Sequence, residues 1–172
     1  MITIGYKQSH SDHTLFIKHS ASRRAIALLV YVDDVIVTRN DLEEREALKW
    51  CLAKEFEIKE LGKLKYFLEI EVAHSKNGIF VSQQKYVLVL LQETRKIKCK
   101  SIDTPIDLNH KLKEENENVT VDKGIYQKLV GRMIYLSHTR SDIAYVVNLM
   151  SQFLHNLKEI HLQVVYRILH YL

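Results

Sequence analysis

Residues 28–38 read LLVYVDDVIVT, and this stretch decides the fold. Two runs of leucine, isoleucine and valine flank a pair of adjacent aspartates, Asp33 and Asp34. Such apolar runs are typical of buried strands, so we predict strands over 24–32 and 35–38. Two strands around two polar residues indicate a β-hairpin, with Asp33-Asp34 as its turn and Tyr31 on the strand that leads into it.

The paired aspartates have two interpretations. Aspartate is a common turn residue, and a bare Asp-Asp pair is more often an ordinary polar turn. Here, however, both flanking strands are strongly apolar, and two carboxylates on such a hairpin are costly unless their charge is compensated. Mg²⁺ is held by one or two carboxylates together with substrate phosphates, which suits a phosphoryl-transfer site. Because neighbours on a strand point in opposite directions, we expect Asp33 to contact metal directly and Asp34 to lie peripherally.

The region after the hairpin alternates helical and extended patterns. Asn40 and Glu43 form a capping box that predicts a helix over 41–56. One apolar face is expected on this helix, formed by Leu42, Leu48, Leu52 and Phe56. A strand over 67–72, a turn at 76–78 and a return strand over 79–81 predict a second hairpin.

The second half of the sequence is mainly helical. Ser82 is placed to cap a helix over 83–93. A loop follows over 96–108, and the polar stretch 113–121 is the best candidate linker. Three further helices are expected, over 122–137, 142–155 and 158–172. The predicted fold class is therefore α+β: a small antiparallel sheet with a helix, followed by a mainly helical region.

Charge, cysteine content and the length of apolar runs limit the partners and the cellular compartment that we expect, but they do not identify a function. Lysine and arginine total 25 against 21 aspartates and glutamates, a net charge of +4 that permits a nucleic-acid partner without demanding one. Only two cysteines occur, which favours a reduced setting. No secretory signal is visible, and the longest apolar run, 25–32, is too short for a membrane span. We expect an intracellular, non-secreted protein without a membrane partner, with cytoplasm and nucleus both open.

Two basic segments are candidate nucleic-acid contacts. One follows the helix over 83–93, where positive charge at a helix C-terminus is also favourable by itself. The other lies just before the strand at 67, where cations could approach a phosphate backbone. The candidate residues are Lys63, Lys65, Arg95, Lys96, Lys98 and Lys100.

Four blocks of the sequence, in order, resemble reverse transcriptases of copia-type (Ty1/copia) retrotransposons. Tyr31-Val32-Asp33-Asp34 between apolar strands resembles the polymerase motif, and LLVYVDDVIVT resembles the signature hairpin of the family. FEIKELGKLKYFLEIEV at 56–72 is similar to the next block, whose hairpin is comparable to a primer grip. YQKLVGRMIYLSHTRSDIAY at 126–145 and HLQVVYRILHYL at 161–172 resemble later helical blocks.

The resemblance implies an RNA-directed DNA polymerase within a Pol polyprotein, with a primer–template duplex as partner and two Mg²⁺ ions as cofactors. It assigns catalysis and metal binding to Asp33 and Asp34, with Tyr31 and Val32 supporting the motif. It also implies three segments: a partial palm over 1–82, a thumb-like start and linker over 83–121, and a helical thumb and connection region over 122–172.

Several residues differ from the family pattern, and these differences lower the catalytic activity that we expect of the chain. The family draws another metal-binding aspartate from an upstream strand. Residues 1–30 contain one aspartate, Asp12, in a stretch that resembles the segment just before the catalytic hairpin and not that strand. Glu69 stands where the family has glycine, and Ser141 where it has proline; Arg95, Ser101 and Leu157 also occupy expected glycine or proline positions. We therefore expect a truncated, catalytically inactive remnant as an isolated chain. The alternatives are a non-catalytic nucleic-acid-binding module and an inert interaction domain.

Overall fold

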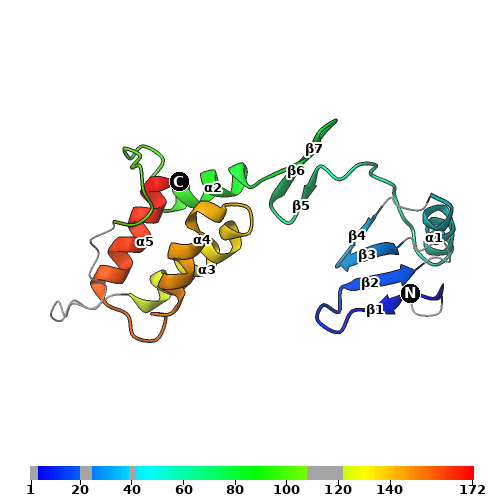
Figure 1. Cartoon of the computed structure of the whole chain (residues 1–172), viewed down its shortest axis with the longest axis horizontal. Coiled ribbons are helices and arrows are strands. Elements are labelled where there is room, and N and C mark those ends of the chain that lie inside the picture. Colours follow the sequence, from blue (N-terminus) through cyan, green and yellow to red (C-terminus); the bar gives the residue numbers. More distant parts are fainter. Residues whose placement is uncertain (1–3, 20–24, 39–41, 108–121) are drawn as a thin grey trace. The chain divides into compact units, whose positions relative to one another are not determined.

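A computed structural model describes residues 4–19, 25–38, 42–107 and 122–172 (Figure 1). It has the predicted α+β class, and it divides into two compact units, Met1–Leu64 and Lys65–Leu172. The predicted cap at Asn40 and the predicted linker over 113–121 lie outside the described residues. The division into 1–82, 83–121 and 122–172 followed the motifs of the sequence and stays a prediction.

The first unit is a four-stranded antiparallel sheet with one helix. Its strands follow chain order, β1-β2-β3-β4. The elements are β1 (Lys7–Gln8), β2 (Leu15–His19), β3 (Ala25–Tyr31), β4 (Asp34–Val37) and α1 (Leu42–Glu55). The strands predicted on either side of the aspartates are confirmed. The two-residue β1 was not predicted, because two residues carry no periodic signal.

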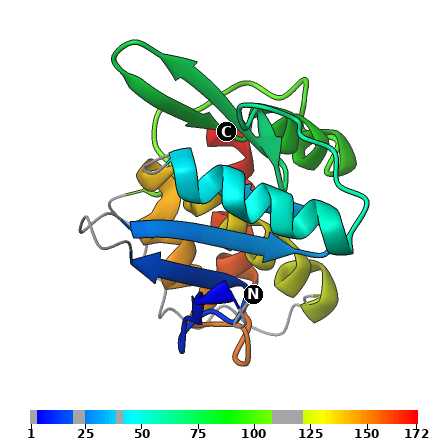
Figure 2. The ribbon, with the colours of Figure 1, turned by 90° about the vertical axis from the view of Figure 1, so that its right-hand side faces the viewer.

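The core of the first unit lies between the sheet and α1. Ile26 and Leu28 alternate along β3, so both point to one face, where they are buried with Leu48 of α1. On the same face, Lys18 of β2 forms an ion pair with Glu44 of α1. Figure 2 shows α1, in cyan, lying over the blue strands. The helix therefore covers the face that carries the even-numbered residues of β3.

The apolar face predicted for α1 is only partly correct. Leu48 is buried and Leu52 packs beside it. Leu42 and Phe56, by contrast, are 63% and 64% exposed. The physical reason is position: Leu42 is the first helical residue and Phe56 lies beyond the last, so neither is directed onto the sheet. The outer side of α1 carries Trp50, which is 69% exposed.

The second unit begins with a three-stranded antiparallel sheet in the order β5-β6-β7. The strands are β5 (Tyr66–Phe67), β6 (Ile70–Ser75) and β7 (Gly78–Ser82), so the predicted second hairpin is confirmed. The continuous strand predicted over 67–72 is wrong, since the chain turns at Leu68 and Glu69. Both residues have positive φ, 46° and 60°, as the two central positions of a type I′ hairpin loop require.

Four helices complete the second unit: α2 (Gln84–Glu93), α3 (Lys123–Ser137), α4 (Ser141–Ser151) and α5 (Glu159–Tyr171). All four were predicted, although α4 ends at Ser151 and not at 155. The cap of α2 is Gln83, one residue later than predicted, while the Ser82 hydroxyl accepts a hydrogen bond from the Gln84 N–H at 3.2 Å.

One hydrophobic core joins these four helices. Buried side chains come from every helix, among them Leu90, Met133, Val147 and Ile168. Tyr126 lies inside this core, and its hydroxyl donates to the Met150 carbonyl at 2.7 Å. Burial raises the pKa of Tyr126 to about 12. The hydroxyl therefore stays protonated and links α3 to α4.

The C-terminus of α2 is a Schellman motif without glycine. The Lys96 N–H donates to the Leu91 carbonyl at 2.7 Å, and the Arg95 N–H to the Gln92 carbonyl at 3.0 Å. Arg95 occupies the left-handed position of the motif with φ 57°. Glycine usually fills this position, because a Cβ makes left-handed backbone costly. The expectation of glycine at residue 95 thus has a geometric basis.

Asp142 ties the start of α4 to the end of α5. It accepts hydrogen bonds from the Arg140 guanidinium, the shortest at 2.6 Å, and from the Tyr171 hydroxyl at 2.9 Å. The hydrogen bond from Arg140 is the main reason that the pKa of Asp142 falls to about 2, and that from Tyr171 lowers it further. The network requires an ionised carboxylate.

We predict that Arg95→Gly stabilises the protein. Glycine relieves the left-handed strain but adds freedom to the unfolded chain, so the free energy of unfolding should rise by about 0.5–1 kcal/mol. Urea unfolding followed by far-UV circular dichroism measures it. Arg95→Ala is the matched control, because it removes the charge and keeps the strain. Equal gains in both variants would show that charge, and not backbone geometry, is responsible.

The Asp142 network predicts a dependence of stability on pH. Because the folded pKa of about 2 lies below the ordinary 3.8, the network stabilises the fold above about pH 4. This contribution is lost as the pH falls through the folded pKa, and it is small, because the carboxyl is 38% exposed. Urea midpoints between pH 5 and 2 should fall less steeply in Asp142→Asn than in the parent chain. In the control Asp103→Asn, which changes an exposed carboxylate, the urea midpoint should change with pH as in the parent chain. If the midpoint of Asp142→Asn fell as steeply as that of the parent, the network would not be the cause.

Candidate catalytic hairpin and nucleic-acid contacts

The β3–β4 hairpin carries the predicted catalytic residues. Its register pairs Leu28 with Val37, Leu29 with Ile36, Val30 with Val35 and Tyr31 with Asp34. The loop is consequently Val32–Asp33, and the predicted turn at Asp33-Asp34 is wrong by one residue. The reason is that each apolar residue of one strand pairs with an apolar residue of the other, which leaves Asp34 as the first residue of β4.

Backbone strain is concentrated at the tip of this hairpin. Val32 has φ 50°, whereas Asp33 does not have positive φ, a pattern that fits a type II′ loop. A β-branched residue in left-handed backbone is a true outlier. Its side chain is also 81% exposed, so it gains little from packing. Strain of this kind costs on the order of 1–3 kcal/mol and tends to occur at functional sites.

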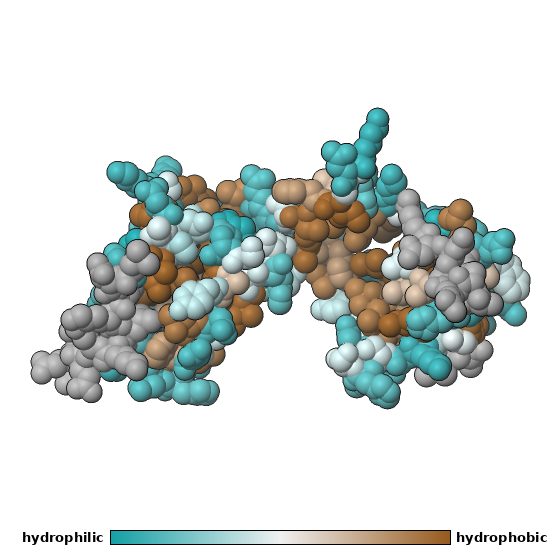
Figure 3. Space-filling model, viewed as in Figure 1, coloured by the Kyte–Doolittle hydropathy of each residue, from teal (hydrophilic) through white to brown (hydrophobic). Residues whose placement is uncertain are grey.

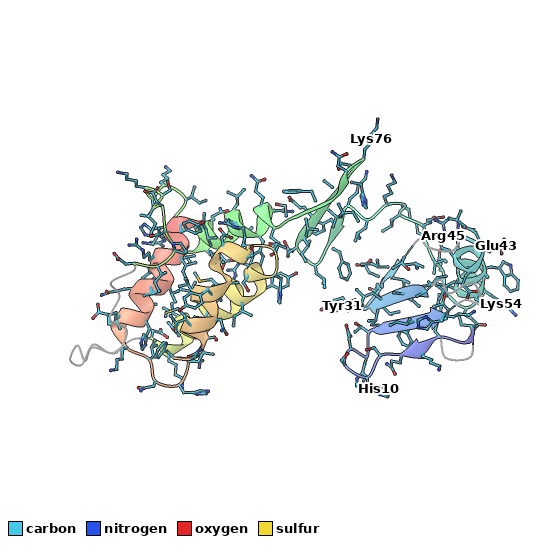
Figure 4. All side chains as sticks on the ribbon, in the orientation of Figure 1. His10, Tyr31, Glu43, Arg45, Lys54 and Lys76 are labelled. Atoms are coloured by element: carbon cyan, nitrogen blue, oxygen red, sulfur yellow. The ribbon has the colours of Figure 1, made fainter. Side chains whose placement is uncertain are left out.

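The aspartates lie on the open side of the sheet. Paired residues share a face, so Asp34 lies with Tyr31, Leu29 and Ile36, on the face opposite to the one that α1 covers. Asp33 stands in the loop beside it. Both carboxylates are exposed. Figure 4 shows Tyr31 at the hairpin end of its strand. The hairpin thus presents two adjacent, exposed carboxylates at the end of two apolar strands.

A metal centre would draw only part of its ligands from this hairpin. Within the described residues, no group of three or more His, Cys, Asp or Glu side chains could hold a metal ion. Asp33 and Asp34 together match the one or two carboxylates that Mg²⁺ takes from a protein. They fit one ion that keeps much of its water, and they do not fit a two-ion centre by themselves. Their assignment as ligands stays a prediction.

The predicted basic residues are distributed over two segments. Lys63 and Lys65, both exposed, precede β5. The others follow α2: Arg95, Lys98 and Lys100 are exposed, whereas Lys96 is half-buried with its ammonium 5.3 Å from the Tyr166 ring centroid. The four cations of the second group therefore lie together beyond the end of α2.

Contacts with α5 fix the segment that carries these cations. The Ile102 N–H donates to the His170 carbonyl at 3.3 Å. The Arg167 guanidinium donates to the Thr104 carbonyl at 3.2 Å and to its hydroxyl at 3.0 Å. Lys98 and Lys100 are thus held on a packed segment, although their own side chains reach into solvent. Their role in binding phosphates stays a prediction.

A group of tyrosines beside the β5–β6 hairpin was missed by the sequence analysis. The Tyr135 hydroxyl of α3 donates to the Leu68 carbonyl, and the Tyr86 ring lies edge-on to Tyr135 with centroids 5.4 Å apart. A hydrogen bond to Glu69 is the main cause that raises the pKa of Tyr66 to about 12. Leu68 and Tyr135 are 67 residues apart, so no periodic pattern could have paired them.

In the part of the chain that the structure describes, no helix has both the length and the apolar character needed to cross a membrane.

Comparisons with known proteins show which proteins this chain is similar to. The retrovirus-related Pol polyprotein from transposon RE1 of Arabidopsis thaliana is 38% identical over 172 residues, which is 100% of this chain and 12% of that polyprotein. The Pol polyprotein from transposon TNT 1-94 of Nicotiana tabacum is 31% identical over 176 residues, covering 97% of this chain and 13% of its own length. The putative transposon Ty5-1 protein of Saccharomyces cerevisiae is 33% identical over 171 residues, covering 98% and 55%.

The chain therefore spans only a part of each of these relatives. No solved structure matches it. A family model described as reverse transcriptase (RNA-dependent DNA polymerase) matches residues 1–108, which include the β3–β4, β5–β6 and β6–β7 hairpins. The match covers well over half of the sequence, and the relatives are Pol polyproteins and a transposon protein. The chain belongs to the reverse transcriptase family, in its copia-type retrotransposon branch.

Proposed function

We propose that this chain supplies the catalytic hairpin and the primer-binding part of a reverse transcriptase within a Pol polyprotein. The reaction is nucleotidyl transfer: the 3′ oxygen of a primer attacks the α-phosphorus of a nucleoside triphosphate, and pyrophosphate leaves. One observation carries the proposal: Asp33 and Asp34 stand side by side at the tip of a hairpin whose apolar strands fix its register.

Each residue of the motif has a separate task in this proposal. Reverse transcriptases as a family use divalent metal ions, and we propose Mg²⁺ here. Bound Mg²⁺ would activate the attacking hydroxyl and neutralise charge on the phosphates. Asp33 and Asp34 would contribute oxygen ligands. Tyr31 pairs with Asp34 across the strands, and Val32 sets the loop, so these two residues hold the carboxylates in place.

The proposed partner is a primer–template duplex. Lysine and arginine beside a duplex neutralise phosphates and release counterions, which gives affinity without sequence preference. The proposed contacts are Lys63, Lys65, Arg95, Lys96, Lys98 and Lys100. Because the Lys96 ammonium also lies over Tyr166, Lys98 and Lys100 are the freer phosphate ligands of the second segment.

A second candidate function is nucleic-acid binding without catalysis. Among the described residues, Asp33 and Asp34 lack a third carboxylate that would complete a metal site. Two-metal catalysis needs carboxylates from more than one strand. Binding and catalysis can therefore separate in this chain, and the next two experiments test them one at a time.

We expect the purified chain to bind duplex DNA weakly, with an affinity that falls steeply as salt rises. Each phosphate contact contributes about 0.9 to the slope of log affinity against log salt. Replacing both Lys98 and Lys100 by glutamine should reduce that slope by about 2. Fluorescence anisotropy from 50 to 200 mM NaCl measures it. The matched control replaces Lys7 and Lys123, which carry the same charge elsewhere. An equal reduction in the control would show a diffuse charge effect, and salt-independent binding would contradict the proposal.

We expect no primer extension by the purified chain with Mg²⁺ or Mn²⁺. The hairpin pair supplies two carboxylates, and a centre of two metal ions needs more ligands than these two side chains. Asp33→Asn should therefore leave the measured rate unchanged at the background level. The fold should tolerate this change or gain stability, because it removes repulsion between adjacent carboxylates. Extension by the parent chain that disappears in Asp33→Asn would prove that a complete site exists.

A further inference from the structure

The β6–β7 hairpin ends in an edge strand whose sequence has no charge and no proline. β7 (Gly78–Ser82) reads GIFVS. Ile79, Phe80 and Val81 are 66%, 69% and 44% exposed, and Figure 3 shows hydrophobic surface below the hydrophilic tip of the hairpin. In the part of the chain that the structure describes, β7 pairs with β6 on one side and with no strand on the other. Edge strands are usually protected by lysine, proline or a bulge, so an uncharged apolar edge indicates a pairing surface.

The register shows which backbone groups face this open edge. The Val72 N–H of β6 donates to the carbonyl of the residue just before β5, at 2.8 Å. Because backbone groups alternate along a strand, the next residue, Ala73, bonds towards β7, where its partner is Phe80. The neighbours of Phe80 on β7, Ile79 and Val81, therefore direct their N–H and C=O groups away from β6 and into the open edge.

Two copies of this edge complement each other in an antiparallel alignment. When Ile79 pairs with Val81 of a second copy, the two residues exchange two backbone hydrogen bonds, and a two-fold axis repeats the pair. Phe80 then lies on the axis opposite its own counterpart, in the type of pair whose side chains approach most closely. Val72, which pairs with Val81 in each copy, extends the apolar face around the two pairs.

The charges of the hairpin favour the antiparallel alignment over a parallel one. Lys76 lies at the tip of the hairpin (Figure 4), and between tip and base the one ionisable residue is His74, on β6 and away from the edge. The base carries two carboxylates and two ammonium groups, which belong to Glu69, Glu71, Lys65 and Lys85. Antiparallel pairing sets each tip cation beside a base of balanced charge, whereas parallel pairing would set two tip cations side by side.

We propose that β7 is a dimerisation strand, which pairs antiparallel with β7 of a second copy of this chain and joins the two β5–β6–β7 sheets into one continuous sheet. The proposal goes beyond the proposed function and holds whether or not the chain binds nucleic acid. Each copy contributes a single strand to the interface. Association is therefore weak and depends on protein concentration.

Ile79→Lys tests the association in the full chain, because it places a charge on the edge strand and leaves the β6–β7 pairing intact. Ile97→Lys is the matched control, the same substitution at an isoleucine that is 52% exposed and lies outside the sheet. Sedimentation velocity from about 1 to 200 µM measures the fraction of dimer. The parent chain and Ile97→Lys should pass from monomer to dimer as concentration rises. Ile79→Lys should need a concentration at least about 10-fold higher.

A disulfide tests the alignment, and it decides the question even if Ile79→Lys does not fold. In a background with Cys51 and Cys99 changed to serine, Phe80→Cys places one thiol on the expected two-fold axis. Lys76→Cys places the thiol at the tip, and antiparallel pairing separates the two tips by about 25 Å, far beyond the reach of a disulfide. Under mild oxidation, Phe80→Cys should form a covalent dimer and Lys76→Cys should stay monomeric.

Four results would overturn the proposal. A parent chain that stays monomeric over the whole concentration range does not pair through β7. Dimerisation of Ile79→Lys at the same concentration as Ile97→Lys would place the interface elsewhere. Disulfide formation by Lys76→Cys as fast as by Phe80→Cys would exclude the antiparallel alignment. Assemblies larger than a dimer would show open-ended edge pairing and not a closed two-fold contact.

Discussion

Left-handed backbone at residues other than glycine is the constraint on which the β3–β4 and β5–β6 hairpins depend. Among the described residues, Val32, Leu68, Glu69 and Arg95 have positive φ. The first three form two-residue hairpin loops, and the twist of the flanking strands demands this backbone whatever the side chain. Each of these loops therefore has strained backbone, which costs free energy but keeps the strands in register. Burial of Ile26 and Leu28 in one unit and the helical core in the other must offset that cost.

The sequence predicted those strands and helices in which apolar residues recur at a regular spacing. The strands around Asp33 and the helices α2, α3 and α5 follow from apolar spacing, and each was found close to its predicted bounds. The position of the first loop was missed by one residue, because turn propensity favoured Asp33-Asp34, whereas cross-strand pairing of apolar residues decided the register. The break at Leu68 was missed because neither Leu68 nor Glu69 is a turn residue.

The sequence proposes the residues of the candidate site, whereas their neighbours in space come from the structure. Asp33 and Asp34 were proposed from an Asp-Asp pair between two apolar strands. The structure adds that Tyr31 pairs with Asp34 across the hairpin. The link from Tyr135 to Leu68 joins residues far apart in the sequence, so only tertiary structure could reveal it. The apolar face of α1 was overestimated because helix ends do not point where the central turns point. Local sequence signals thus name candidate residues, while contacts between residues far apart in the sequence become visible only in the structure.

The exposed indole on α1 has a spectroscopic consequence. Trp50 is the single tryptophan of the chain, and it belongs to the first unit. Its side chain is 69% exposed, and the Lys54 ammonium lies 5.9 Å from the ring centroid. Intrinsic tryptophan emission therefore reports on the surroundings of α1, and it is blind to melting of the helical core around Tyr126. Emission and far-UV dichroism that change at different denaturant concentrations would mean that the two units lose their structure in separate steps.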